Sequence, residues 1–453
     1  KYILYKIYYN AERTIFMSVT FKGGLHIPDC KDITNKLPIK KAPGAPVHIY
    51  PLQQHIGAPL DLSVKQGDYV YVGQVLASSD AFVSAPIHSS VSGTVTKIAP
   101  HLHPSGAMVT SVFVENDFKY ERFRGLKIYN PDKMTPAEML EVIKQAGIVG
   151  MGGAGFPTHV KLSPPKDKKI THIIVNGAEC EPYLTSDHRR MLENPEKIIG
   201  GLKIAMKILG LNDGYIGVEE NKADAIEILK KVCPENIHVV SLKAKYPQGA
   251  EKQLIYAITK RQVPSGGLPA DAGAIVLNID TVTAINNAFY EGCPLIERIV
   301  TMSGDCYASP CNLAVLTGVP FSHLAELAGG FTKDVKKFIM GGPMMGIAQY
   351  SLDVPVIKTT SCLLALSEAQ TSFDPNTPCI RCGTCVNHCP MHLSPLYLAK
   401  YAEEGNLDKC EKFHILDCIE CGLCSYLCPG FQSPLSHIRL GKQQILENRR
   451  KNK

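Results

Sequence analysis

The sequence predicts a multidomain α/β protein, and three patterns along its 453 residues support that prediction. Residues 45–124 alternate apolar and turn-forming residues with a period of two, which is typical of β-strands. Residues 125–297 alternate helix and strand signals, as α/β folds do. Residues 376–440 contain a repeated run of cysteines. At roughly 150 residues per domain, the length corresponds to about three domains.

The composition is that of a globular chain, with 45% hydrophobic and 20% charged residues. The formal net charge of +6 is too small over this length to indicate a nucleic-acid partner. No apolar run approaches the ~18 residues that a membrane helix needs. Residues 1–16 mix charged side chains into an apolar stretch, so we expect no secretory signal there and expect Met17 to be the natural start.

The first 124 residues divide into an N-terminal segment, residues 1–44, and an all-β module, residues 45–124. The spacing of apolar and turn-forming residues in this module resembles that of a lipoyl- or biotinyl-type barrel sandwich. Those carriers attach their cofactor to a lysine at a hairpin tip, whereas residues 78–82 read SSDAF. We therefore expect a structural or docking role for this module.

Residues 125–297 are predicted to form one α/β domain. Thr135, Pro136 and Glu138 form a capping box, which predicts a helix that ends near Ala146. Further helices are expected at residues 195–209 and 222–232, and strands at residues 169–175, 215–218, 238–242 and 274–279.

Residues 298–350 are predicted to form a small α+β module, with a strand at 299–303 and a helix at 321–328. Residues 351–375 carry few periodic signals and are predicted to be a linker. At the other end of the chain, residues 441–453 are predicted to be a solvated basic tail.

Eight of the 16 cysteines fall between residues 379 and 428, which suits metal binding in a reducing compartment better than a disulfide scaffold. Residues 379–396 read CIRCGTCVNHCPMHLSPL and residues 418–435 read CIECGLCSYLCPGFQSPL. The offset is 39 residues, and ten of the eighteen positions are identical. Each copy is the bacterial ferredoxin run for a [4Fe-4S] cluster, and it predicts a helical two-cluster domain over residues 376–440.

In this run the fourth cysteine lies too far along the chain to reach the same cubane and ligates the other cluster. The predicted ligand sets are therefore crossed: Cys379, Cys382, Cys385 and Cys428 hold one cluster, and Cys418, Cys421, Cys424 and Cys389 hold the other. Zinc knuckles and disulfides are the alternatives. Zinc needs only four ligands, usually as two C-x2-C pairs, and does not explain two four-cysteine runs that each end in proline.

Residues 150–155, GMGGAG, match the pattern G-x-G-x-x-G. A dinucleotide-binding turn should follow a strand, yet a capped helix precedes this one, so an ordinary Rossmann site is disfavoured. A tight helix-to-loop turn is the alternative. The glycines still allow backbone amides to approach a phosphate or a flat ring closely.

The strand after this loop ends in residues 176–182, NGAECEP, whose carboxylates could accept a ribose hydroxyl or a ring N–H, or could pair with Arg189 and Arg190. Clusters move single electrons and nicotinamides move hydrides, and a flavin is the usual cofactor that does both. A phosphate-cradling domain beside two clusters therefore favours FMN or FAD, with NAD(H) as the two-electron partner.

Residues 150–162 (GMGGAGFPTHVKL) and 176–182 resemble the FMN- and NADH-binding region of the complex I flavoprotein subunit. A closer resemblance runs from Phe21 over essentially the whole chain, to the RnfC family, the C subunit of the Rnf ion-translocating electron-transport complex. Its motifs include GGLHIP at 23–28, QHIGAP at 54–59 and GGPMMG at 341–346. The resemblance implies that residues 298–350 are a soluble-ligand-binding β-grasp (SLBB) module and that residues 125–297 form a Rossmann-like FMN/NAD(H) domain.

The resemblance also implies roles for individual residues. Phe156 would stack on the nicotinamide and Glu181 would contact NAD(H). Non-covalent FMN would be held by Gly150, Gly152, Gly153, Gly155, Lys161, Asn176, Glu179, Glu251, Asn278 and Thr281, the last two near its phosphate. The chain departs from complex I at Met151, Ala178 and Ala250, which replace an arginine, an aspartate and a glutamate.

The resemblance implies a peripheral subunit on the cytoplasmic side of the cell membrane, within an ion-translocating ferredoxin:NAD⁺ oxidoreductase. Its partners would be the other Rnf subunits and NAD(H), with ferredoxin reached indirectly through one of them. The alternatives are a flavin and iron–sulfur cobalamin reductase of diol-degrading microcompartments, and a cluster scaffold with a vestigial nucleotide fold.

Overall fold

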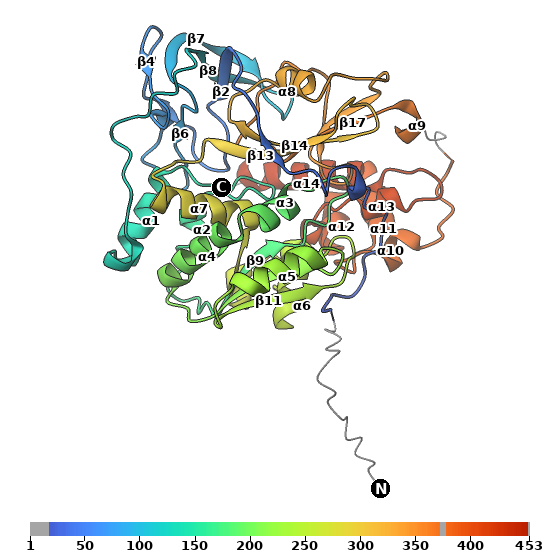
Figure 1. Cartoon of the computed structure of the whole chain (residues 1–453). Coiled ribbons are helices and arrows are strands. Elements are labelled where there is room, and N and C mark those ends of the chain that lie inside the picture. Colours follow the sequence, from blue (N-terminus) through green and yellow to red (C-terminus); the bar gives the residue numbers. More distant parts are fainter. Residues whose placement is uncertain (1–17, 372–376, 452–453) are drawn as a thin grey trace.

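The computed structural model describes residues 18–371 and 377–451 (Figure 1). The expected start at Met17 lies outside the described residues. Among these residues, no helix has the length and apolar character needed to cross a membrane.

The β module consists of two small sheets. One has the order β2 (Val47–Pro51), β8 (Met108–Asn116), β7 (Gly93–Leu102), β4 (Tyr69–Val70), and the other has the order β3 (Asp61–Leu62), β5 (Val75–Ser78), β6 (Ile87–His88). Its core is built from alternate residues of these strands, among them Tyr50, Leu76 and Val112. The loop after β5 packs against the next domain, where His159 Nε2 lies 2.8 Å from Phe82 O.

The α/β domain has a parallel four-stranded sheet in the order β11 (Ile237–Leu242), β10 (Gly214–Glu219), β9 (His172–Gly177), β12 (Ala274–Asn278). Its helices are α1 (Pro136–Gln145), α2 (Thr158–Lys161), α3 (Ser186–Glu193), α4 (Pro195–Leu209), α5 (Ala223–Val232), α6 (Glu251–Thr259) and α7 (Ile279–Tyr290). The chain steps from β9 outward to β11 and then returns to β12 on the other side of β9. Open α/β sheets bind ligands in the crevice outside the carboxyl ends of the strands, at such a switch point in strand order.

A six-stranded sheet follows, in the order β1 (Ile39–Lys41), β14 (Cys311–Leu316), β13 (Glu297–Gly304), β17 (Cys362–Leu366), β15 (Lys337–Met340), β16 (Ile347–Gln349). Helix α8 (Phe321–Leu327) packs on it. The prediction of a linker at residues 351–375 is wrong where β17 lies, because β17 is an interior strand whose residues are all buried. Because β17 is buried on both faces, it lacks the polar alternation by which strands are recognised.

The N-terminal segment also joins other domains. Strand β1 pairs with β14 at the edge of the six-stranded sheet. Before it, Val19 forms a β-bridge with Leu242, and Gly24 N donates to His388 O at 3.0 Å. The segment therefore ties the α/β domain to the cysteine domain.

The cysteine domain is helical, with α9 (Glu368–Thr371) before it and α10 (Thr384–Asn387), α11 (Pro395–Glu403), α12 (Leu407–Lys412), α13 (Leu423–Tyr426) and α14 (Pro434–Lys451) within it. The predicted basic tail from residue 441 is helical as far as Lys451, because α14 continues through it. Residues 446–451 are exposed, as expected of a solvated end. Gly441 and Ile445 are buried on the face of α14 that packs on α11. Short 3₁₀ turns are η1 (Lys31–Ile33), η2 (Pro131–Lys133), η3 (Pro269–Ala272) and η4 (Ile415–Asp417).

Candidate functional site

The glycine loop lies between α1 and α2, after a helix as expected and not after a strand. A β-bridge between Val149 and Pro157 closes it, and Gly150 N donates to Phe156 O at 2.8 Å. Thr281 Oγ1, on α7, accepts a 3.1 Å hydrogen bond from Met151 N. Thr281 therefore anchors the loop over the start of α7.

Two glycines of the loop differ in what a side chain would meet. A Cβ on Gly152 would lie 3.2 Å from Cβ of Asn278, so this position is crowded by the protein itself. A Cβ on Gly153 would meet nothing within 4 Å. The fold does not require a glycine at position 153, and its bare backbone faces open space.

Asn176 and Asn278 are paired in register at the carboxyl ends of β9 and β12, on either side of the switch point. Asn278 Oδ1 caps α7 by accepting from Asp280 N at 2.9 Å. Asn176 Nδ2 donates to Gly249 O at 2.8 Å. The two side chains thus place a helix N-terminus and a backbone loop at this edge of the sheet, where phosphate-bearing ligands bind in related sheets.

Lys161 and Glu251 also meet. The Lys161 ammonium, at the end of α2, lies 2.6 Å from Glu251 Oε1, at the start of α6. Both side chains remain partly exposed, at 30% and 39%. The structure thus brings together two residues that the sequence predicts for the cofactor site.

Glu179 follows β9 in a left-handed conformation, with φ of 43°. Its side chain is only 3% exposed, and Oε1 accepts from Asp187 N at 2.7 Å. Oε2 lies 3.6 Å from the Lys31 ammonium but accepts no hydrogen bond. Burial, followed by the charges of Glu179 and Asp280, raises the pKa of Asp187 well above its usual range. A buried carboxylate oxygen that accepts no hydrogen bond, beside the switch point, suits a ligand hydroxyl or ring N–H.

Glu181 accepts hydrogen bonds from a different part of the chain. Its Oε1 accepts from Met344 N at 2.7 Å and from Met345 N at 3.0 Å, in the turn at residues 341–346. Burial raises the pKa of this carboxyl. Phe156, the other residue expected to contact NAD(H), is half-buried directly after the glycine loop.

Sequence reasoning missed an ionic cluster beneath the loop. Asp280 accepts from Arg190 Nε at 2.9 Å and from Arg298 Nη1 at 2.8 Å, and Arg298 Nη1 lies 2.7 Å from Met151 Sδ. Burial alone would raise the pKa of Asp280, but the two guanidinium groups outweigh it and lower the pKa. No local pattern reveals this cluster, because Arg298 comes from β13 in another sheet.

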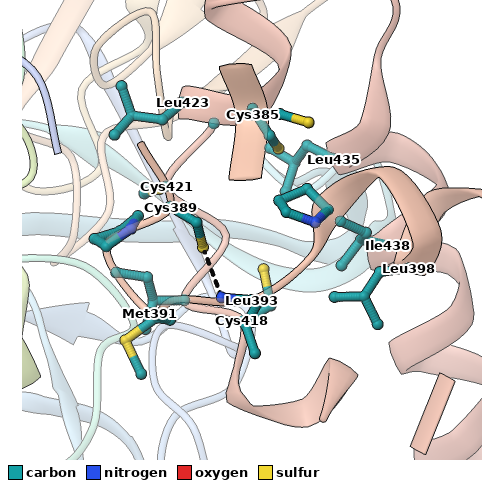
Figure 2. Close-up of a pocket in the computed structure, with 15 residues that line it drawn as sticks. Cys385, Cys389, Met391, Leu393, Leu398, Cys418, Cys421, Leu423, Leu435 and Ile438 are labelled. Carbon is teal, nitrogen blue, oxygen red and sulfur yellow. Dashed lines mark hydrogen bonds between the residues drawn. The ribbon is translucent and has the colours of Figure 1, made fainter. Parts of the chain in front are cut away.

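Figure 2 shows a cavity in the cysteine domain. Its lining includes Cys389 from the first run together with Cys418, Cys421 and Cys424 from the second, and also Cys385, which the crossed assignment gives to the other cluster. Leu393 N points at Cys389 Sγ and Glu420 N at Cys418 Sγ, each at 3.4 Å. Burial, and then the neighbouring thiols, raises the pKa of Cys421 to about 12. In residues 18–371 and 377–451, no three His, Cys, Asp or Glu side chains converge on a point suited to one metal ion.

The remaining cysteines of the two runs lie nearer the surface. Cys379 and Cys382 are exposed, and burial and these two thiols raise the pKa of Cys385. Gln432 Nε2, just after Cys428, donates to Thr377 O at 2.7 Å. This contact brings the loop of Cys428 back to the start of the first run. Crossed ligation of the two clusters stays a prediction.

The geometry agrees with comparisons to known proteins. Family models match residues 19–119 (RnfC Barrel sandwich hybrid domain), 143–287 (Nuo51 FMN-binding domain) and 371–429 (4Fe-4S dicluster domain). The last two models establish FMN and [4Fe-4S] clusters as the cofactors of these regions.

Curated relatives match nearly the full chain. The C subunit of the Na⁺-translocating ferredoxin:NAD⁺ oxidoreductase complex of Acetobacterium woodii is 46% identical over 95% of this chain and 98% of its own length. The C subunit of the proton-translocating complex of Clostridium ljungdahlii is also 46% identical, over 88% of each chain. The corresponding protein of the ion-translocating oxidoreductase complex of Pseudomonas aeruginosa is 41% identical over 95% of this chain and 56% of its own. The chain therefore belongs to the RnfC family, the C subunits of ion-translocating ferredoxin:NAD⁺ oxidoreductase complexes.

Proposed function

We propose that the chain exchanges a hydride with NAD(H) at FMN and relays single electrons through two [4Fe-4S] clusters. It does so as a peripheral subunit on the cytoplasmic side of the cell membrane. Its complex couples ferredoxin:NAD oxidoreduction to transport of Na⁺ or H⁺. The two relatives named for different ions are equally similar to this chain, so similarity does not select the coupling ion.

In this proposal, FMN would lie at the carboxyl ends of β9 and β12, beside the switch point. The loop of Gly150, Gly152, Gly153 and Gly155 offers backbone amides there, and the N-terminus of α7 favours a phosphate. Asn278 and Thr281 hold the loop and that helix end together. When bound, FMN supplies the conversion between hydride and single-electron chemistry.

The other side chains bind and orient. Lys161 and Glu251 form an ion pair whose ammonium is near enough to the surface to meet a phosphate, and Asn176 fixes the neighbouring Gly249 loop. Oε2 of Glu179, which faces the Lys31 ammonium and accepts no hydrogen bond, would accept one from a ligand. Phe156 would stack on the nicotinamide, and Glu181 would contact NAD(H) from the turn it holds.

The two cysteine sets would hold the clusters as thiolates, with the amides of Leu393 and Glu420 stabilising the charge on sulfur. The module around residues 298–350, extended by β1 and β17, is proposed to be the β-grasp (SLBB) unit of the family. Ferredoxin would reach this chain through a partner protein of the complex.

The cobalamin reductase alternative resembles the flavin and cluster core, but it begins near the glycine loop. Here the matched barrel sandwich precedes that loop. The intact loop glycines, Glu179 and Glu181 weigh against a scaffold with a vestigial nucleotide fold. The match of residues 143–287 to an FMN-binding family model is the observation that carries the flavin proposal.

Gly153→Ala tests this proposal. The added methyl meets no protein atom, so the fold should keep its thermal stability, whereas FMN affinity should fall because the backbone can no longer approach the ligand. FMN binding is measured by fluorescence quenching, with Ala154→Gly as the control that adds no bulk. Undiminished FMN affinity in Gly153→Ala would place the flavin elsewhere.

A further inference from the structure

One buried cation at the site comes from the N-terminal segment. Lys31, the first residue of η1, is only 4% exposed. Its ammonium donates to Glu181 O at 3.0 Å and to Leu184 O, and it lies 3.6 Å from Glu179 Oε2. Lys31 therefore contacts the turn that carries both carboxylates expected at the flavin and the nicotinamide.

That turn, between β9 and α3, has an unusual backbone. Glu179 and Tyr183 are both left-handed, with φ of 43° and 68°. Residues other than glycine rarely adopt this conformation and keep it where surrounding contacts impose it. Lys31 supplies two such contacts, and Tyr183 N donates to Asp29 O at 2.8 Å. The N-terminal segment thus holds the turn from outside the α/β domain.

The segment around η1 is itself fixed to two other elements. Thr34 Oγ1 lies 2.7 Å from Thr185 Oγ1, directly before α3. Asn312 Nδ2, on β14, donates to Thr34 O at 3.0 Å and to Leu37 O at 3.1 Å. Lys31 therefore extends from a segment that the six-stranded sheet supports.

Four titratable groups from four different elements interact with the charge of Glu179: Lys31, Lys222, Asp187 and Cys362. Burial raises the pKa of the last two, which favours their uncharged forms. The ammonium of Lys222 is paired with Glu219 Oε2 at 2.8 Å. This leaves Lys31 as the counter-charge of Glu179.

We propose that Lys31 is a positioning residue of the flavin site, which holds Glu179 as a buried anion whose Oε2 accepts a hydrogen bond from FMN. This rests on the proposed function, because FMN is the ligand that Glu179 would contact. Lys31 lies within residues 19–119, matched by the barrel-sandwich model, and outside residues 143–287, matched by the FMN-binding model. The flavin domain thus depends on a charge that another part of the chain supplies.

Lys31→Met tests the inference in the full-length chain, because methionine keeps much of the apolar stem and removes the charge. A buried carboxylate that loses its counter-charge binds a proton more readily. In this variant, each pH unit below the point where Glu179 takes up its proton should weaken FMN binding by up to about tenfold. Fluorescence quenching measures FMN affinity from about pH 9 down to about pH 6.5, over which the affinity of the unmodified chain should stay constant.

Two further variants separate charge from structure. Lys36→Met removes an exposed lysine of the same segment and should bind FMN like the unmodified chain. The double variant Lys31→Met with Glu179→Gln should lose the pH dependence, because an amide does not titrate in this range. A purely structural role of Lys31 would instead weaken FMN binding by the same factor at every pH.

An infrared measurement covers the case in which Lys31→Met does not fold. Difference spectra recorded as FMN binds should show the band of an ionised carboxylate in the unmodified chain, and Glu179→Gln should lack that band. A band of a protonated carboxyl group that disappears in Glu179→Gln would overturn the inference.

The outcomes separate this inference from the function on which it rests. Unchanged FMN affinity in Lys31→Met, or a loss that is independent of pH, would overturn the role of Lys31 while FMN binding by the unmodified chain stands. Failure of the unmodified chain to bind FMN at any pH would overturn the proposed function, and the role of Lys31 with it.

Discussion

At the residue scale, Glu181 has a structural contact that sets how its role can be tested. Its Oε1 accepts two amide N–H groups of the turn at residues 341–346. A glutamine keeps that acceptor and removes only the charge, so Glu181→Gln should preserve the turn. Truncation to alanine would remove the acceptor of both amides, at up to about 1–3 kcal/mol for the part-buried Met344 N and less for the exposed Met345 N.

We predict that Glu181→Gln and Phe156→Ala slow the reduction of bound FMN by NADH and leave FMN affinity unchanged. Both residues lie beside the glycine loop and outside it. Stopped-flow absorbance measures flavin reduction, and fluorescence quenching measures FMN binding. Loss of FMN from both variants would refute the division into flavin and nicotinamide contacts.

Lys358 is a buried cation that joins three parts of the molecule. Its ammonium donates to Pro86 O at 2.6 Å, in the β module, and to Gly147 O at 2.7 Å, after α1. Burial lowers the pKa of this ammonium to about 7. Above that pH the folded chain holds the neutral amine, while the unfolded chain keeps its proton up to about pH 10.4.

The unfolded state therefore binds more protons in this window, and Lys358 makes stability rise with pH, by at most about 1.4 kcal/mol per pH unit. We predict that the difference in Tm between the unmodified chain and Lys358→Met shifts in favour of the unmodified chain from pH 7 to pH 9. Calorimetry of both proteins across that range measures it. A constant difference would mean that Lys358 does not titrate there.

At the element scale, the sequence predicts elements that have polar and apolar faces. Helix α4 matches its predicted span, and α1 has the predicted capping box. Strand β17 and helix α7 were missed, because buried elements lack the alternation that separates one face from another. Whether β17 and α7 form a strand or a helix depends on packing against segments that are distant in the sequence, which a local pattern does not contain.

The dicluster domain was predictable from cysteine spacing, because thiols must reach one cubane from short loops, whereas the ligand sets stay a prediction. The contacts of Arg298 and Lys358 were not predictable, because each side chain bonds a segment that is distant in the sequence. The same holds for Glu181 and the turn at residues 341–346.

Helix α14 gives a test of packing in the cysteine domain. A Cβ on Gly441 would lie 2.9 Å from Cβ of Ala402 on α11. We predict that Gly441→Ala lowers the Tm of the cysteine domain, although alanine favours a helix by about 1 kcal/mol over glycine. The control is Leu440→Ala, because Leu440 is 51% exposed. A rise in Tm for Gly441→Ala would show that α11 and α14 pack less closely.

At the scale of the whole molecule, domains that are separate in sequence are joined at one place. Three segments contact the cysteine domain beside Cys389 or Cys421: the N-terminal segment, the turn at residues 341–346 and the loop around Tyr246. The barrel sandwich joins the other domains through two other contacts. Its loop after β5 packs against α2, and Lys358 donates a hydrogen bond to Pro86 O within it. This arrangement joins the proposed flavin edge to the cysteine domain through direct contacts.

The central claim is that electrons from a hydride donor enter at FMN and leave through the clusters. Anaerobic addition of NADH to the full-length chain reconstituted with FMN and iron–sulfur clusters tests it most directly. The account predicts that flavin absorbance is bleached and that the EPR signal of a reduced [4Fe-4S] cluster appears with it. Bleaching without a cluster signal, in protein whose clusters dithionite does reduce, would contradict it.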